Sequence, residues 1–271
     1  MTKKLPWHIR RNNLKLALKK QLEYQKKNFN RLISLNNLKL ENQRIVSIGH
    51  ACQVPAHIKN FNLNNNETEF FDWLISDFSS IYYLLNNKDN DIFDINNFTD
   101  QSIYTDQGSS DSCLKIEHKK FKMISLHDYS INISWDIDNP TPSIVAETNN
   151  FLDKYKRRWI RFKTNFKNFE KNKLISVFDH QFTKCYIPTR EEIKNVLDKL
   201  STITDNEIQI HFIWPTYLNE DAESKEFQNM INGIDCCYYH VLKQIDGFTR
   251  KSTWIDSHLN WYEIMFNILN S

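Results

Sequence analysis

The chain has 271 residues, of which 40% are hydrophobic, 25% charged and 13% aromatic, with four glycines and six prolines. These proportions are typical of a soluble globular protein with a substantial core, and they exclude collagen-like and Gly- or Pro-rich low-complexity chains. No apolar run approaches the roughly 20 residues of a membrane-spanning helix. No secretory signal follows the basic first residues, so we expect a cytoplasmic protein. The five cysteines, an odd number, predict free thiols rather than a disulfide framework.

The net charge of +2 conceals a strongly basic amino-terminal segment. Residues 1–44 contain twelve Lys and Arg against two Glu, and leucines recur at positions 14, 18 and 22. This spacing predicts an amphipathic helix. The helix has three possible roles: it lies on an anionic membrane surface, packs on the acidic remainder of the chain, or contacts nucleic acid. Nucleic acid is the least favoured, because no recognition motif is present. We predict a basic helical extension over residues 1–43 and one α/β domain of catalytic type over residues 44–271.

Beyond this extension, short apolar strands alternate with helices along the chain. The predicted strands cover residues 44–49, 121–126, 174–178 and 208–214, and residues 86–111 are predicted to be mostly loop with at most a short helix. The predicted helices cover residues 55–61, 76–87, 143–172, 189–201 and 259–269, and the fourth of them opens on a capping box, Thr-Arg-Glu-Glu. The alternation predicts an α/β fold with an open, mostly parallel sheet of Rossmann or flavodoxin type and helices on both faces.

Cys52 follows the first predicted strand and precedes the first predicted helix. In open α/β sheets, ligands collect outside the carboxyl ends of the strands. A thiol at the amino end of a helix is also stabilised as thiolate by the helix dipole and by unpaired N–H groups. The same N–H groups, from Ala51 to Gln53, would stabilise an oxyanion, and the Gln53 side chain is a further donor. The sequence therefore predicts a nucleophile at Cys52, and the alternative is a small residue that closes a strand–helix turn.

His127 and Asp128 follow the second predicted strand. If that strand runs parallel to the first and close to it, the imidazole lies on the same sheet edge as the thiol and acts as its base. Asp72 and Asp128 are the candidates for the group that orients the base. The alternatives are a solvated turn for His127 and Asp128, and a helix cap near residue 76 for Asp72.

Three ordered motifs carry a resemblance to a known family. They are Ser-Ile-Gly-His-Ala-Cys-Gln-Val at 47–54, Phe-Asp-Trp at 71–73 and Leu-His-Asp-Tyr at 126–129. In this order they resemble a family of bacterial and viral proteins catalogued as papain-like cysteine peptidases, and the resemblance covers about residues 44–215. It implies that Cys52 is the nucleophile of a cysteine peptidase. The spacing departs from that of papain itself, because His127 follows Cys52 by only 75 residues rather than by roughly 130–150.

The strand–cysteine–helix order also resembles capsule-biosynthesis proteins with a Gly-Asn-Cys-Gln signature, which are similar to small α/β esterases. This resemblance implies an acyltransferase or esterase that acts on a surface glycan. Small α/β esterases often place an Asp and a His a few residues apart in a late loop, which makes Asp256 and His258 an alternative acid–base pair. Trp73 would form an aromatic wall for a sugar or an acyl chain.

We therefore predict an enzyme that forms a thioester acyl-enzyme on Cys52 from a small-molecule, peptide or glycan acyl substrate. A non-catalytic α/β binding module is the alternative from another class. We expect no cofactor, because the chain has no Gly-rich phosphate loop. We expect no metal either, because Cys236, Cys237 and His240 lack the usual ligand spacing and fit a buried helix face better.

Overall fold

The structure, a computed structural model, describes residues 16, 19–20, 23–24, 26–28, 30, 42–48, 53–61, 63, 67–72, 74–105, 112–120, 123–125, 142–178, 186–215, 221–242 and 261–271. Its centre is a four-stranded sheet in which every neighbouring pair is parallel. The strands, in spatial order, are β1 (Gln43–Ser47), β6 (Lys171–Val177), β7 (Glu207–Pro215) and β8 (Cys237–Leu242). The predicted α/β fold with an open parallel sheet is confirmed.

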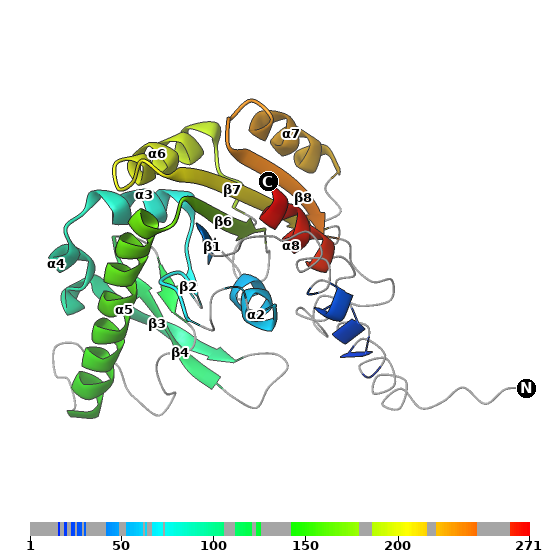
Figure 1. Cartoon of the computed structure of the whole chain (residues 1–271). Coiled ribbons are helices and arrows are strands. Elements are labelled where there is room, and N and C mark those ends of the chain that lie inside the picture. Colours follow the sequence, from blue (N-terminus) through cyan, green and yellow to red (C-terminus); the bar gives the residue numbers. More distant parts are fainter. Residues whose placement is uncertain are drawn as a thin grey trace, which may run out of the picture.

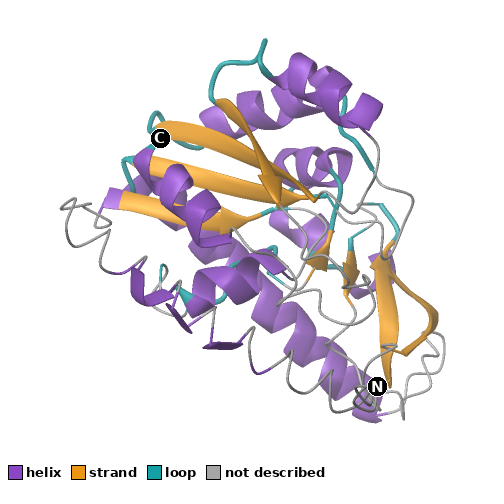
Figure 2. Ribbon diagram, turned by 90° about the vertical axis from the view of Figure 1, so that its right-hand side faces the viewer, coloured by secondary structure: helices purple, strands orange, loops and turns teal. Residues whose placement is uncertain are grey.

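Helices cover both faces of this sheet (Figures 1 and 2). One face packs on α2 (Gln53–Asn60) and α8 (Trp261–Asn270). The other packs on α3 (Phe78–Asn86), α5 (Pro142–Asn168), α6 (Arg190–Ser201) and α7 (Asp221–Ile231). Successive side chains of a strand point to opposite faces, so Ile45 joins the α2–α8 cluster and Val46 the other. The inner strands β6 and β7 are buried on both faces, and polar side chains such as Asn172, Lys173 and His211 are buried in them beside the apolar ones.

The helix that begins at Arg190 has the capping box expected from its sequence. The Thr189 side chain accepts from the Glu192 backbone N–H, and the Glu192 carboxylate accepts from the Thr189 N–H at 2.8 Å. This reciprocal pairing satisfies two N–H groups that the helix itself leaves without partners.

A second sheet is inserted between β1 and β6, and the sequence did not predict it. Its strands, in spatial order, are β2 (Leu74–Ile75), β5 (Ile124–Ser125), β4 (Ser112–His118) and β3 (Phe98–Thr105), all antiparallel. The short helix allowed in residues 86–111 is present as α4 (Asp89–Ile92), followed by η2 (Ile95–Asn97). The prediction that the rest is loop is wrong, since this stretch also contains β3. Its Asn- and Asp-rich sequence suggested turns, whereas cross-strand pairing with β4 holds it as a strand.

Two predicted elements change their character. The strand predicted over 121–126 is described only as β5, and it belongs to the second sheet rather than lying parallel to β1. Cys237 and His240 lie on strand β8, which corrects the predicted helix face. In β8 the backbone pairs with β7 while the side chains are only partly covered, a pattern that periodicity alone does not separate from a helix.

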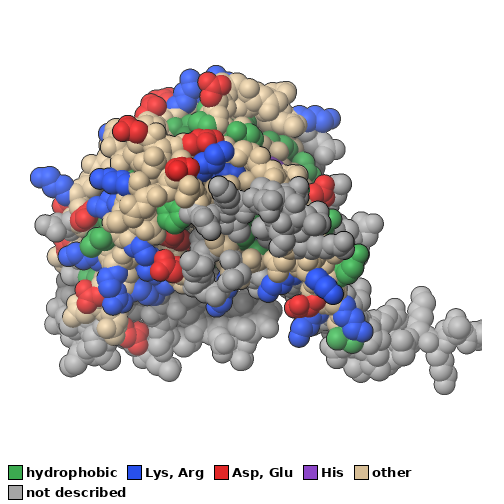
Figure 3. All heavy atoms as spheres, viewed as in Figure 1, with side chains coloured by type: hydrophobic (Ala, Val, Ile, Leu, Met, Phe, Trp, Pro, Cys, Tyr) green, Lys and Arg blue, Asp and Glu red, His purple; other side chains and the backbone are tan. Residues whose placement is uncertain are grey.

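The described residues between 16 and 30 are helical, whereas Gln43 already belongs to β1. Leu16 and Tyr24 are 55% and 66% exposed. This helical part of the extension, dark blue in Figure 1, lies at one side of the molecule below α8, and Figure 3 shows Lys and Arg side chains on that side. No helix in the described part of the chain is both long and apolar enough to cross a bilayer. The division into residues 1–43 and 44–271 stays a prediction.

Candidate functional site

Most of the predicted site residues lie outside the described part of the chain. These are Ala51, Cys52, Trp73, His127, Asp128, Asp256 and His258. Gln53 is described as the first residue of α2, without its side chain. Asp72 is described in full. The structure therefore defines the elements on either side of the site and one of its acidic groups.

The residues on either side of Cys52 form a strand and a helix, in the order that the sequence predicted. The backbone N–H of Ile48 continues the β1–β6 ladder by donating to the Ile175 oxygen at 2.8 Å. Strand β1 ends at Ser47 and helix α2 begins at Gln53, so five residues connect the two elements, and Cys52 is the last of them in sequence. Pro55 is buried in the first turn of α2, where its missing N–H costs no helical hydrogen bond.

The topology of the parallel sheet draws attention to a pair of residues that the sequence analysis missed. Strand β6 pairs with β1, and Asp179 and His180 follow its end by two and three residues. Because parallel strands end at one edge of a sheet, the segments after β1 and β6 start from neighbouring points. The sequence feature that could have identified this pair is an Asp-His dipeptide shortly after a predicted strand. Both residues lie outside the described part of the chain.

Asp72 is a buried carboxyl group with one oxygen bound and the other vacant. The residue is 6% exposed, and its Oδ2 accepts from the Glu69 backbone N–H at 2.8 Å. Its Oδ1 is buried without a hydrogen-bond partner among the described residues. The alternative of a helix cap is wrong, since Asp77 caps α3 by accepting from the Ser80 N–H. A carboxylate with one fixed and one vacant oxygen is suited to orient a second polar group.

Burial raises the pKa of the Asp72 carboxyl to about 7. The hydrogen bond from the Glu69 backbone opposes this rise, and the nearby Glu69 carboxylate adds to it. The guanidinium groups of Arg158 and Arg44 lower the pKa. The group is therefore poised between its neutral and charged forms near pH 7, as is often found for groups in functional sites.

Glu69, three residues before Asp72, forms a buried ion pair with Arg44 of β1. Nη2 and Nε of Arg44 donate to the two carboxylate oxygens at 2.6 and 3.0 Å, and the two side chains are 2% and 4% exposed. This bidentate pair connects the strand that precedes Cys52 to the loop that carries Asp72.

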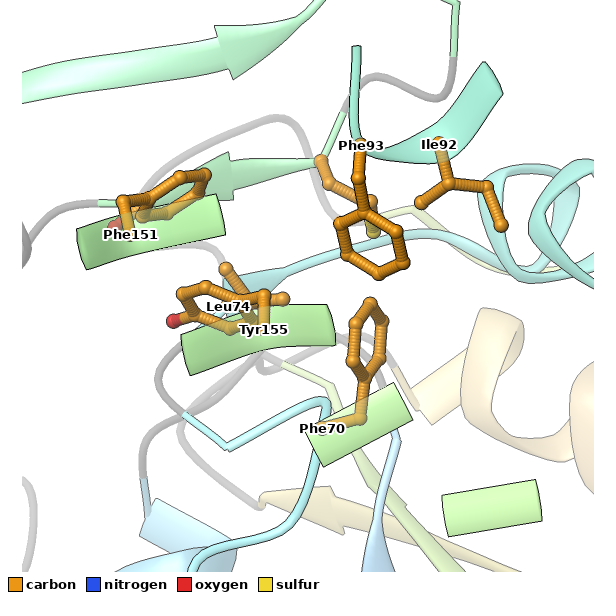
Figure 4. Close-up of a pocket in the computed structure, with 8 residues that line it drawn as sticks. Phe70, Leu74, Ile92, Phe93, Phe151 and Tyr155 are labelled. Carbon is orange, nitrogen blue, oxygen red and sulfur yellow. The ribbon is translucent and has the colours of Figure 1, made fainter. Parts of the chain in front are cut away.

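An apolar pocket lies beside the same loop (Figure 4). Its cavity volume is about 20 Å³, enough for about one water molecule. Helices α4 and α5, the strands β2 and β5, and the residues next to them line it with Phe70, Leu74, Ile92, Phe93, Met123, Ser125, Phe151 and Tyr155.

The cysteines of β8 differ from the predicted nucleophile. Burial raises the pKa of the Cys237 thiol to about 12, and it also raises the pKa of Cys236. His240 is engaged with His211, with 3.0 Å between Nε2 and Nδ1. Within the described residues no group of three or more His, Cys, Asp or Glu is placed to hold a metal ion.

Comparison with known proteins assigns the chain to a family. The family model described as "Putative papain-like cysteine peptidase (DUF1796)" matches residues 43–232, and the chain belongs to this family. A curated relative, the uncharacterized protein R408 of Acanthamoeba polyphaga mimivirus, is 25% identical over 236 residues, covering 82% of this chain and 96% of the relative. No solved structure matches significantly. At the level of the family, these findings support a cysteine hydrolase.

Proposed function

We propose that the protein is a cysteine hydrolase that uses Cys52 as its nucleophile and His127 as its general base. The Cys52 thiolate attacks the carbonyl carbon of an amide or ester, and His127 protonates the departing amine or alcohol. The resulting thioester is cleaved by water, whose proton His127 accepts, and the thiol is restored as the acid leaves. Asp72, or Asp128 in its place, orients the imidazole. Backbone N–H groups from Ala51 to Gln53 stabilise the oxyanion.

The observation that carries this proposal is the buried Oδ1 of Asp72, which has no hydrogen-bond partner in the described part of the chain. In the antiparallel ladder of β2 and β5, Leu74 pairs with Ser125 and Ile75 with Ile124. Asp72 lies two residues before Leu74 in sequence, and His127 lies two residues after Ser125. We propose that the Asp72 carboxylate and the His127 imidazole meet beyond this end of the β2–β5 pair.

The hydrophobic core supports the meeting of the three motifs. Ile48 precedes Cys52, Phe71 and Leu74 flank Asp72, and Met123 precedes His127; all four belong to one buried cluster. The motifs therefore start from a common region, although β1 and β5 belong to different sheets. A thiol at the start of α2 would also gain from the helix dipole.

The pocket next to Asp72 is lined by Phe70, Leu74 and Ser125, so it adjoins two of the three motifs. With a volume of about 20 Å³ it is too small for a peptide side chain or an acyl chain. Trp73 stays the predicted aromatic wall for a sugar or an acyl chain.

A second candidate function, acyl transfer to or from a glycan or hydrolysis of its ester, would use His258 and Asp256 instead. The observation in its favour is the docking of α8 on α2. The ring of Trp261, three residues after His258, stacks on His57 of α2 at 4.2 Å between centroids. The segment before α8 thus ends against the helix that follows Cys52.

The acyl-enzyme is tested with 4-nitrophenyl acetate as acyl donor. We expect a burst of one nitrophenolate per protein and, by mass spectrometry, an acetyl group on Cys52. Cys52→Ala should abolish the burst, whereas Cys236→Ala, which removes a thiol of raised pKa, should leave it intact. A burst that persists in Cys52→Ala, or the absence of any burst, would favour the non-catalytic binding module.

The same assay identifies the base. His127→Ala should slow the burst at least tenfold, within the range found for general-base removal, while His258→Ala and His180→Ala should not. Loss of the burst in His258→Ala alone would favour the esterase or acyltransferase arrangement. Loss in His180→Ala alone would move the base to the segment after β6.

A further inference from the structure

The Arg44 guanidinium is held by partners from two other parts of the chain. Besides its two bonds to Glu69, Nη1 donates to the backbone oxygen of Phe162 on α5 at 3.0 Å. Its face lies over the rings of Phe162 and Phe166, 5.1 and 5.4 Å from their centroids. A planar group held by three hydrogen bonds and two aromatic faces has a single orientation.

Glu69 extends this fixed geometry to Asp72. Its carboxylate is held by Arg44, and its backbone N–H donates to Oδ2 of Asp72 at 2.8 Å. Arg161 of α5 supports the same loop, because its Nη2 donates to the Thr68 backbone oxygen. The Glu69 carboxylate thus connects the loop to β1, and the Thr68 backbone oxygen connects it to α5.

Stability alone is a weak reason to bury this pair. Removing two charges from water is costly, and well-packed apolar residues in place of a buried ion pair are often equally stable. What an ion pair with bidentate geometry supplies in addition is a defined orientation of both partners. The orientation defined here is that of the Asp72 carboxylate relative to β1.

We propose that Arg44 and Glu69 are positioning residues, which hold Asp72 in the place from which it orients the general base of Cys52. This inference rests on the proposed function. Arg44 acts through Glu69, and Glu69 acts through Asp72; neither touches the reacting atoms. We call the Arg44–Glu69 ion pair the clamp. Loss of the clamp would leave the base poorly oriented, and the Cys52 thiolate would lose the imidazolium that stabilises it.

The test compares Glu69→Gln with Glu67→Gln. Both remove one carboxylate from the same loop, but the Glu67 side chain is 54% exposed and lies 3.8 Å from Arg161. The measured quantity is the rate of Cys52 alkylation by iodoacetamide at pH 7 in the folded protein, with near-ultraviolet circular dichroism to establish folding. We expect Glu69→Gln to slow alkylation about tenfold or more, as the thiol pKa returns toward about 8.5, and Glu67→Gln to match the wild type.

The direction in which Glu69→Gln changes the alkylation rate distinguishes a loss of positioning from a simple change of charge. Removing the Glu69 carboxylate leaves the positive charge of Arg44 without its partner, and a pure charge effect would stabilise the thiolate and speed alkylation. Arg44→Lys keeps every charge and removes only the planar fork, so it tests geometry alone and serves also if Glu69→Gln does not fold. We expect Arg44→Lys to slow alkylation about threefold to tenfold. Its rate would then lie between that of the wild type and that of an ordinary thiol with a pKa of about 8.5.

The outcomes distinguish this inference from the proposed function. Fast alkylation of Cys52 in the wild type and in both Glu69→Gln and Arg44→Lys would overturn the positioning role and leave the nucleophile in place. A wild-type Cys52 no faster than the other thiols would overturn the proposed function, and the positioning role with it. Slower alkylation in the clamp variants, with Glu67→Gln unchanged, supports both.

Discussion

At the scale of single residues, the unusual feature is a carboxyl group kept in a nearly dry loop. Asp72 is buried, and burial is the main cause of its raised pKa. A residue that only capped a loop through its Glu69 hydrogen bond would need one carboxylate oxygen. The second oxygen is vacant among the described residues, which gives it a role only if another polar group faces it.

Asp72→Asn tests that role. Asparagine preserves the shape and can still accept from the Glu69 N–H, but it cannot stabilise an imidazolium and favours the wrong tautomer of the base. We expect the 4-nitrophenyl acetate burst to slow by at least tenfold, with little change in the thermal midpoint. The burst rate is measured from pH 5 to 9. An unchanged pH–rate profile would contradict the orienting role of Asp72.

At the scale of elements, β7 and β8 meet through two neutral histidines. Nε2 of His211 and Oε1 of Gln209 are 3.2 Å apart, and the Gln209 amide is oriented by its own bond to Glu207. His211 therefore donates from Nε2 and accepts at Nδ1 from Nε2–H of His240, 3.0 Å away. Burial lowers the pKa of both imidazoles, that of His240 to about 4. The strand pair is thus built for uncharged rings.

This arrangement predicts sensitivity to acid. Between pH 6.5 and 4 the unfolded chain protonates His240 before the folded protein does, so the free energy of unfolding falls as the pH decreases through this window. We expect His240→Gln, which retains a donor for His211, to lose about 2 kcal/mol less than the wild type over this range. Urea unfolding at several pH values measures it, with Tyr238→Phe as the control. Parallel curves for His240→Gln and the wild type would contradict the prediction.

At the scale of the whole molecule, the two faces of the parallel sheet have separate cores. The cluster of α2 and α8 contains Trp261, which is fully buried and stacks on His57. We expect Trp261→Ala to lower the free energy of unfolding by about 3–5 kcal/mol, in the range of large aromatic deletions. Tyr262→Ala, at a half-buried position on the same helix, should cost less than half of that amount. Urea denaturation measures both variants, and equal losses would mean that α8 is not anchored through Trp261.

The basic extension exposes both apolar and basic side chains, and its role is tested with the full-length chain. Leu16 and Tyr24 are exposed beside exposed lysines, which leaves apolar and basic groups available for an anionic surface. We propose that the extension contacts membranes. The full chain should co-sediment with vesicles rich in phosphatidylserine, and a chain lacking residues 1–40 should not. If the deletion lowers the thermal midpoint and leaves sedimentation unchanged, the extension packs on the body instead.

Local signals predicted three of the four strands of the parallel sheet, whereas β8, the second sheet and the Arg44–Glu69 pair were not predicted. β1, β6 and β7 each contain a short apolar stretch, and the capping box marks the start of α6. β2 and β5 have two residues each, too few for a periodic pattern, and they exist through pairing. The Arg44–Glu69 bond joins residues 25 positions apart, so nothing in the neighbourhood of either residue predicts the other. The strand–cysteine–helix order was local, and it was predictable.

The central claim, a thiolate nucleophile at Cys52, is tested most directly by alkylation with iodoacetamide across pH 5–9, with labelled sites read by mass spectrometry. Cys236 and Cys237, whose thiol pKa values are raised, serve as internal comparators. We expect selective labelling of Cys52 with an apparent pKa below about 7, and a higher value in His127→Ala. Labelling of Cys52 no faster than that of the other cysteines at any pH would contradict the claim.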